Sequence, residues 1–327
     1  MKTTGMSQRF LRIMAVLLLT FQTHAFEVDS SYTLASSFQK YHQQYPQLAI
    51  ADLRLADRVR VELDREYANI EGRTLHLDLF VPHNRPPKAT VILIHGGGWR
   101  SGNKSHFFPL AGALANRGYL TVTVEYRLSV EAPYPAGLID INRAIVWLKN
   151  HAENYQIDVS KMALMGGSSG GHMAALLANT ADLQLYRPPE ISGDTQVQAV
   201  IDMDGILDLT SDLGLKYEDK NGRKDTAMGL WLEGNYASQT ARWQQVSPAY
   251  YITGNSPPML FISSGQARFA EGHDKVFAQL DKLGIKHQFH NFNNAPHTFW
   301  LFHPWFDQVV EKTDDFLSKQ LNYANPE

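Results

Sequence analysis

Apolar, β-branched runs alternate with amphipathic helical patterns along most of this 327-residue chain, and this alternation constrains the fold more than any other feature. The strand-like runs are residues 59–67, 75–81, 89–95, 120–126, 162–165, 197–203, 259–263 and 286–292. The helical patterns are residues 110–117, 138–150, 171–179, 274–283 and 307–321. Such alternation predicts βαβ units, and hence an α/β fold in which a mostly parallel sheet carries helices on both faces.

The first 25 residues have the layout of a secretory signal peptide. Lys2, Arg9 and Arg12 precede the apolar run 13–21, and small residues follow it at the positions that a signal peptidase requires. An uncleaved anchor is the alternative, although the run is short for a membrane span. We expect a mature chain that begins near Phe26 and is exported to the periplasm or out of the cell.

The remaining residues, 26–327, are enough for a single α/β domain. Within it, the long polar segment of about 207–251 is expected to form a lid-like insertion. Residues 26–57 look helical and partly polar, without an evident place in the fold.

Composition excludes several classes of protein. The formal net charge is −3, and loss of three cations and no anions with residues 1–25 makes it −6. That sign disfavours nucleic acid and anionic membrane surfaces as partners. The chain has no cysteine, which excludes disulfides and thiol catalysis.

A glycine and serine cluster separates a predicted strand from a predicted helix at residues 166–171, GGSSGG. It contains two overlapping copies of G-x-S-x-G, centred on Ser168 and Ser169. This pattern is typical of a nucleophile elbow, where glycines let the strand and the helix approach closely around an exposed serine. The glycine spacing alone fits both serines.

A second glycine run follows the strand at 89–95 and reads His95-Gly96-Gly97-Gly98-Trp99. Consecutive glycines leave backbone N–H groups unobstructed, so that two of them can stabilise one developing negative charge. A phosphate-binding loop is the alternative. However, neither the Lys-Ser/Thr of a P-loop nor a G-x-G-x-x-G pattern is present.

Taken together, HGGGW at 95–99, EYRL at 125–128, YPA at 134–136 with Asp140, and GGSSGGH at 166–172 resemble the α/β-hydrolase esterases of the hormone-sensitive-lipase and feruloyl/acetyl-xylan esterase group. The resemblance covers the chain from about residue 59 onward. It implies that Ser168 is the nucleophile and that Ser169 replaces the group's alanine. It also implies an oxyanion hole formed by Gly97, Gly98 and Ser169, and a reaction that needs no cofactor or metal.

The general base is expected late in the chain, because the order on this fold is serine, acid, histidine. The resemblance assigns the base to His297, which precedes Thr298-Phe299 and so matches the group's terminal His-x-Phe. His303 is an alternative. A metal site built from His287, His290 and His303 would lack a supporting carboxylate pattern.

The acid departs from the group's pattern. The usual aspartate lies three residues beyond the glycine that ends the seventh strand, and Arg268 occupies that place here. Asp204, at the end of the preceding strand, is the preferred replacement. Asp274 and Glu271 remain open as alternatives.

The substrate is expected to be a small-molecule or oligosaccharide ester. The tail NAPHTFWLFHPWF resembles a subgroup that includes periplasmic pectin acetylesterases, which implies acetylated pectic fragments. Arg268, Trp99 and Trp300 are the candidate substrate-binding residues, through a uronate carboxylate and through stacking on sugar rings. A feruloyl or general carboxylesterase is the alternative, as is a non-catalytic binding protein on the same scaffold.

Overall fold

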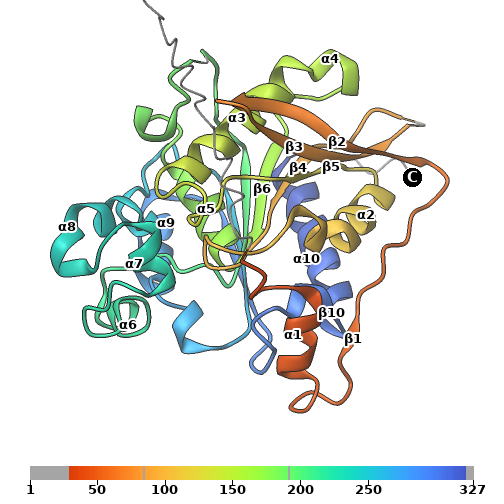
Figure 1. Ribbon diagram of the computed structural model, residues 1–327. Helices are drawn as coiled ribbons and strands as arrows, with labels where there is room; N and C mark the ends of the chain where they lie inside the picture. The colour runs from red at the N-terminus through yellow and green to blue at the C-terminus, as the bar shows by residue number, and fades with distance from the viewer. Residues whose placement is uncertain (1–28, 84, 191, 322–327) are drawn as a thin grey trace, which may run out of the picture.

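The computed structural model describes residues 29–83, 85–190 and 192–321 (Figure 1). Its central sheet has eight strands in the order β2-β3-β5-β4-β6-β7-β8-β9. The pairs β2–β3 and β3–β5 are antiparallel, and every later pair is parallel. The strands are β2 (Val59–Ile70), β3 (Arg73–Pro82), β4 (Thr90–Ile94), β5 (Leu120–Val124), β6 (Met162–Gly167), β7 (Ala199–Met203), β8 (Met259–Ser263) and β9 (His287–Asn291).

Helices cover both faces of this sheet (Figure 1). One face packs against α3 (Ala136–Asn150), α5 (Ser169–Asn179) and α9 (His273–Leu283). The other face packs against α2 (Phe108–Asn116) and α10 (Trp305–Gln320). Shorter elements are α4 (Ala152–Tyr155), η1 (Lys104–Phe107), η2 (Gln184–Tyr186), η5 (Ala267–Phe269) and η6 (Phe299–Leu301). The predicted α/β-hydrolase fold is therefore confirmed.

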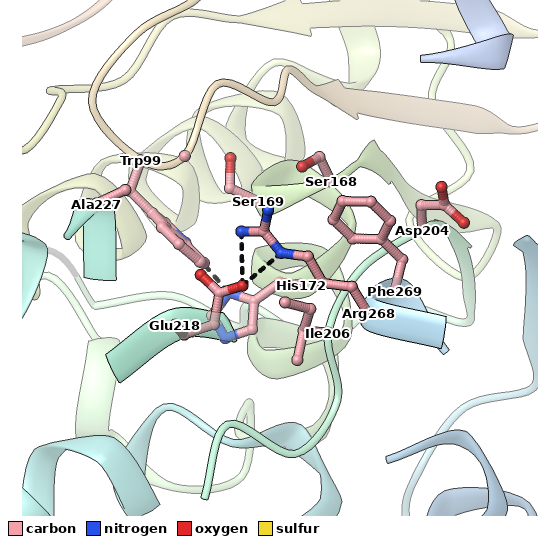
Figure 2. Close-up of a pocket in the computed structure, with 11 residues that line it drawn as sticks. Trp99, Ser168, Ser169, His172, Asp204, Ile206, Glu218, Ala227, Arg268 and Phe269 are labelled. Atoms are coloured by element: carbon pink, nitrogen blue, oxygen red, sulfur yellow. Dashed lines mark hydrogen bonds and ion pairs between the residues drawn. The ribbon is translucent and has the colours of Figure 1, made fainter. Parts of the chain in front are cut away.

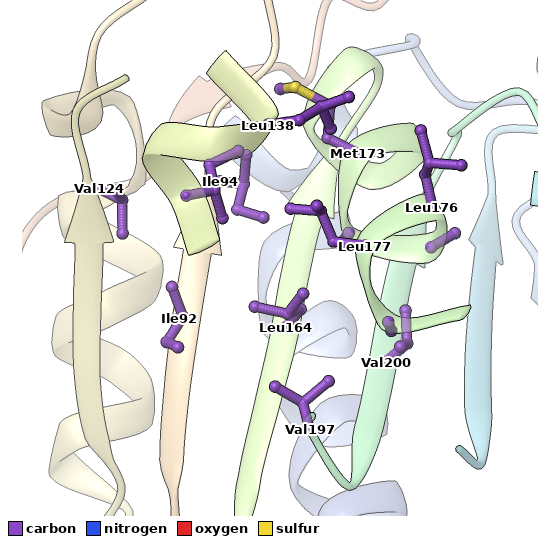
Figure 3. Packing of buried hydrophobic residues seen from close by; sticks show 14 of the residues in the cluster. Ile92, Ile94, Val124, Leu138, Leu164, Met173, Leu176, Leu177, Val197 and Val200 are labelled. Atoms are coloured by element: carbon purple, nitrogen blue, oxygen red, sulfur yellow. The ribbon is translucent and has the colours of Figure 1, made fainter. Parts of the chain in front are cut away.

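Alternate residues of the central strands enter the two cores, as the pleat of a strand requires. In β4, Ile92 and Ile94 face α3 and α5, whereas Val91 and Leu93 face α2 and α10. Figure 3 shows the first of these cores, where Met173 and Leu177 of α5 lie over the strands. Because both faces are covered, these strands are apolar at nearly every position.

All eight predicted strands are present, with ends that differ from prediction by a few residues. The N-terminal segment is the main departure. Only α1 (Leu34–Tyr41) is helical there, and β1 (Ala49–Ile50) pairs with β10 (Phe302–His303) in a separate two-stranded sheet. The predicted signal peptide at residues 1–25 lies outside the described residues. Within the described ranges, no helix is long and apolar enough to span a membrane.

The segment expected to form an insertion lies beside the carboxyl edge of the sheet, at the left of Figure 1. It contains α6 (Asp212–Gly214), the π-helical turn η3 (Leu215–Asp219), α7 (Ala227–Trp231), α8 (Tyr236–Gln245) and η4 (Pro248–Tyr250). Its buried Trp231 and Trp243 join the core on the α5 face, so the segment is packed on the domain rather than detached from it. Its role as a lid stays a prediction.

Candidate active site

Ser168 lies at the turn between β6 and α5, with a φ of 56° and a ψ of −125°. A positive φ is unfavourable for a residue with a side chain, so the surrounding structure must impose it. The flanking glycines allow the close approach that does so. A Cβ at Gly166 would lie 2.2 Å from the Gly170 carbonyl carbon, and a Cβ at Gly170 would lie 2.0 Å from the Ile94 oxygen. The elbow geometry thus depends on both glycines.

The two serines of the elbow have different surroundings. Ser168 Oγ lies 2.8 Å from His297 Nε2. Ser169 begins α5 and is 3% exposed, and within the described part of the chain its hydroxyl has no hydrogen-bond partner. Only Ser168 can therefore transfer its proton to a histidine.

The His297 ring joins Ser168 to a buried carboxylate. Nδ1 lies 2.8 Å from Oδ2 of Asp204, whose side chain is fully buried. A carboxylate only accepts, so Nδ1 carries the hydrogen and Nε2 is left to accept the proton of Ser168. The other oxygen, Oδ1, accepts the N–H of Ser264 at 2.8 Å. This backbone bond fixes the carboxylate's orientation.

The structure brings His297 to Asp204 and not to the alternative acids. Asp204 follows β7 with a φ of 54°, a turn that directs its side chain along the carboxyl edge of the sheet. Asp274 lies in the first turn of α9, and the carbonyl of Glu271 accepts the N–H of Leu207. No hydrogen bond joins His297 to either of them in the described residues.

Burial lowers the pKa of His297 from its ordinary value, because the charged imidazolium loses hydration. The hydrogen bond and the charge of Asp204 act in the opposite direction, and the charge of Arg268 lowers the pKa further. Phe269 stacks on the imidazole with ring centroids 3.5 Å apart. His297 is thus held neutral and in one orientation, as a general base requires.

The glycine loop after β4 lies against the elbow. A Cβ at Gly96 would lie 2.6 Å from the Gly167 oxygen, and Gly97 and Gly98 have φ values of 129° and 61°. Within the described ranges, the amides of Gly97, Gly98 and Ser169 donate no hydrogen bond to the protein. They are therefore free to bind an oxyanion. Gly98 and Ser169 line the pocket beside Ser168, whereas Gly97 is not among its lining residues.

A small pocket, with an empty volume of about 350 Å³, opens beside Ser168 (Figure 2). Its lining residues are Gly98, Trp99, Ser168, Ser169, His172, Asp204, Ile206, Glu218, Ala227, Arg268 and Phe269. Glu218 and Ala227 come from the segment 207–251, which therefore forms one wall of the pocket.

Trp300 does not form the sugar platform that we expected. It is 1% exposed and packs on Gly167, whose Cβ would lie 2.5 Å from the indole. Trp99 is 5% exposed and stacks on Trp231 at 4.9 Å, but it does line the pocket. The predicted stacking on sugar rings is therefore corrected for Trp300 and stays a prediction for Trp99.

His172, the last residue of the GGSSGGH motif, holds Trp99 in place. Trp99 Nε1 donates to His172 Nδ1 at 3.3 Å, and His172 Nε2 donates to the Val246 oxygen at 2.6 Å. Burial lowers the pKa of His172 to about 4, so the ring is neutral and can accept the indole N–H.

We expected Arg268 to bind a substrate carboxylate, but in the structure its charge is paired with a carboxylate of the protein. Its Nε and Nη2 both bind Oε1 of Glu218, at 2.8 Å and 2.7 Å. The carboxylate that pairs with Arg268 comes from the turn η3 and is neither Glu271 nor Asp274.

The other histidines that the sequence singled out are His303, His287 and His290. His303 Nδ1 lies 3.1 Å from Asp307 Oδ2, while His287 and His290 lie on β9. Across the described residues, no group of three or more histidine, aspartate or glutamate side chains is placed to hold a metal ion.

Sequence reasoning missed four residues of the site: Ser264, Phe269, Glu218 and His172. Ser264 directly follows β8, and Phe269 directly follows Arg268. Nothing in their residue types marks a role. Glu218 lies in a long polar segment with several other carboxylates. His172 was visible as the end of the elbow motif, a signal that could have identified it.

Comparison with known proteins agrees with this geometry. The BD-FAE family model matches residues 77–268, a segment that contains Ser168 and Asp204. "Probable carboxylic ester hydrolase LipM" of Mycobacterium tuberculosis is 37% identical over 58% of this chain and 44% of its own length. "Esterase LipQ" of the same organism is 28% identical over 75% of this chain and 59% of its own length. The chain thus spans about half the length of the curated relatives that it matches.

Solved structures share the fold. A thermophilic esterase of Thermogutta terrifontis, Est2, has a TM-score of 0.68 at 24% identity, over 85% of this chain and 99% of that one. "Truncated form of carbohydrate esterase from gut microbiota" has a TM-score of 0.65 at 20% identity, over 82% of this chain and 99% of that one. The resemblance that the sequence motifs implied is confirmed at the level of the group. The segment that the family model matches makes up more than half of this chain, and the chain therefore belongs to the BD-FAE family.

Proposed function

We propose that this protein is a serine carboxylic ester hydrolase that forms an acyl-enzyme on Ser168. The observation that carries the proposal is the continuous chain of two 2.8 Å contacts from Ser168 through His297 to Asp204. Serine needs both a base that removes its proton and a group that orients that base. The names of the relatives LipM and LipQ, an ester hydrolase and an esterase, support the same chemistry.

In the acylation step, Ser168 Oγ attacks the ester carbonyl while His297 Nε2 takes the hydroxyl proton. The carbonyl oxygen becomes an oxyanion that accepts hydrogen bonds from the amides of Gly98 and Ser169, with Gly97 as the third candidate donor. His297 then returns its proton to the alcohol oxygen, and the C–O bond of the ester breaks. Asp204 stabilises the imidazolium throughout without itself taking the proton.

In the deacylation step, water takes the place of the alcohol. His297 removes one proton from the water, and the resulting oxygen attacks the acyl carbon on Ser168. The bond to Ser168 breaks, the proton returns to Oγ, and a carboxylic acid leaves.

A fluorophosphonate probe tests the nucleophile directly, because it labels only an activated serine. We expect stoichiometric labelling of the wild type and of Ser169→Ala, and none of Ser168→Ala. Hydrolysis of 4-nitrophenyl acetate should fall by about 10³-fold or more in Ser168→Ala. Labelling of Ser168→Ala at the wild-type rate would refute the proposal.

We further propose short-chain esters of carbohydrates as the substrates, such as acetylated pectic oligosaccharides. The pocket beside Ser168 is small, which favours a small acyl group. Proteins of similar fold include one described as a carbohydrate esterase. The signal-peptide layout of residues 1–25 supports export to the periplasm or the medium, where such substrates occur.

Comparative rates separate this proposal from a feruloyl or lipid-type esterase. We expect kcat/KM for acetylated pectic oligomers to exceed that for feruloyl and long-chain esters. A preference for feruloyl esters would replace the substrate class and keep the mechanism. The non-catalytic alternative rested on Arg268 in the acid's usual place, and Asp204 now supplies that carboxylate.

A further inference from the structure

Glu218 is an unusual group in the wall of the pocket because it is both charged and almost completely enclosed. Its side chain is 3% exposed, and it lines the same pocket as Ser168. It lies on the π-helical turn η3, a local geometry that often marks a functional position. Figure 2 shows its carboxylate facing the guanidinium of Arg268.

The two carboxylate oxygens of Glu218 are used unequally. Oε1 receives both N–H groups of Arg268, at 2.8 Å and 2.7 Å. Among the described residues, none donates a hydrogen bond to Oε2. A carboxylate oxygen has two lone pairs, so Oε2 is an unused acceptor at the edge of the pocket.

The charges of this pair determine what Oε2 can accept. The guanidinium and the carboxylate together have a net charge of zero, so the pair gives no general attraction to ions. A substrate anion placed at Oε2 would meet a like charge, whereas a neutral hydroxyl would donate a hydrogen bond to it. This wall of the pocket therefore suits a hydroxyl and not the uronate carboxylate that we first considered.

The Glu218–Arg268 pair is also connected by contacts to the general base, His297. Phe269 stacks on His297, and the guanidinium of Arg268 lies 5.1 Å from the centre of the Phe269 ring. Contacts thus run without interruption from His297 through Phe269 and Arg268 to Glu218. His297 is the group that protonates the departing alcohol, and this role is the reason for assigning the alcohol portion of the ester, rather than the acyl portion, to this wall of the pocket.

We propose that Glu218 Oε2 binds a hydroxyl group of the alcohol portion of the substrate, and thereby selects monoesters of polyhydroxy alcohols. Arg268 is the positioning residue, since it binds Oε1 and leaves Oε2 without a donor. The inference rests on the proposed ester hydrolysis and adds to it the chemistry of the alcohol.

Paired substrates isolate this contact. Each pair is a hydroxyalkyl acetate and its methyl ether, such as 2-hydroxyethyl acetate and 2-methoxyethyl acetate, with the propyl and butyl homologues to vary the reach. The pair members differ in the donor and in one methyl group. We expect wild-type kcat/KM to favour the hydroxyl member of at least one pair by about 10-fold to 100-fold, the usual effect of a hydrogen bond to a charged group.

Glu218→Gln is the matching variant, because it keeps the side chain's size but removes the charge. We expect its hydroxyl preference to fall to less than about 3-fold. The preference is a ratio of rates within each pair, so a general loss of activity in the variant does not change it. Glu271→Gln, a carboxylate outside the pocket, should keep the wild-type preference. A merely structural Glu218 would instead lower the rates on both members of each pair equally.

The outcomes separate the inference from the function beneath it. A wild-type enzyme that cleaves both members of every pair at equal rates overturns the role of Glu218, even if Glu218→Gln does not fold. Retention of the full preference in a folded Glu218→Gln also overturns it. Absence of both ester cleavage and fluorophosphonate labelling in the wild type would instead overturn the proposed ester hydrolysis.

Discussion

Asp204→Asn should nearly abolish ester hydrolysis, and the hydrogen bonds of Asp204 explain why. Oδ1 accepts the N–H of Ser264 at 2.8 Å, and Oδ2 accepts the hydrogen on His297 Nδ1 at 2.8 Å. An asparagine has only one acceptor. Its oxygen must meet the Ser264 N–H, since an NH₂ there would place two donors together in a buried site.

The asparagine NH₂ therefore faces His297 Nδ1, which must accept its hydrogen. The single ring hydrogen of neutral His297 then moves to Nε2, where it faces Ser168 and blocks proton transfer. An aspartate-to-asparagine change that inverts the tautomer in this way lowers kcat by about 10⁴-fold. That loss corresponds to about 5 kcal/mol of transition-state stabilisation.

The assay is hydrolysis of 4-nitrophenyl acetate, with circular dichroism to establish that the variant folds. Asp274→Asn and Glu271→Gln are matched controls that remove a carboxylate nearby in the chain, and we expect both to stay within about 2-fold of the wild type. A folded Asp204→Asn that keeps more than a tenth of the wild-type kcat would refute the reasoning. So would a 10³-fold loss in either control.

Four further outcomes follow from the same geometry. Activity should be lost as the pH falls through the pKa of His297, because the base works only when it is neutral. Burial lowers that pKa, so the midpoint of the acid limb of kcat/KM should lie below pH 6.5. Ser169→Ala should leave thermal stability unchanged or raised, since its buried hydroxyl has no partner among the described residues. Asp202→Asn should raise the free energy of unfolding above pH 7 relative to the wild type. Burial raises the pKa of that carboxyl to about 7, so the wild type loses stability as the pH rises through it. Gly170→Ala should lower the free energy of unfolding by about 1–3 kcal/mol in urea titrations, because its Cβ would lie 2.0 Å from the Ile94 oxygen. An unchanged midpoint of unfolding in Gly170→Ala would contradict the packing argument.

The fold could be predicted closely because its signals are local. The run 89–95 is short, β-branched and apolar at nearly every position, a pattern typical of a strand covered on both faces. The N-terminal segment was predicted less well, since the two-residue strand β1 forms only by pairing with β10, which is distant in the sequence.

The elbow and the glycine loop were visible for the same local reason. Close approach of the backbone at Gly166 and Gly170 permits only glycine, so the spacing of glycines records the turn directly. The choice of Ser168 over Ser169 needed either the resemblance to a family or the position of His297.

Aromatic side chains gave the poorest predictions. Trp99 and Trp300 are near the reacting groups, but a large apolar ring near a site is suited both to binding a ligand and to filling the core. An exposure of 1% shows that Trp300 fills the core, whereas Trp99, at 5%, packs on Trp231 and also lines the pocket. Exposure is a property of the folded chain alone.

The sequence by itself determined the strands, the elbow, the glycine loop and the histidine, because each depends on residue types within one short stretch. Only the tertiary structure decided that His297 meets Asp204, and not Asp274 or Glu271. It likewise decided that Glu218 forms the ion pair with Arg268. Those pairings join residues that are 93 and 50 positions apart. A carboxylate is chemically the same at every position, so only the folded backbone determines which one reaches its partner.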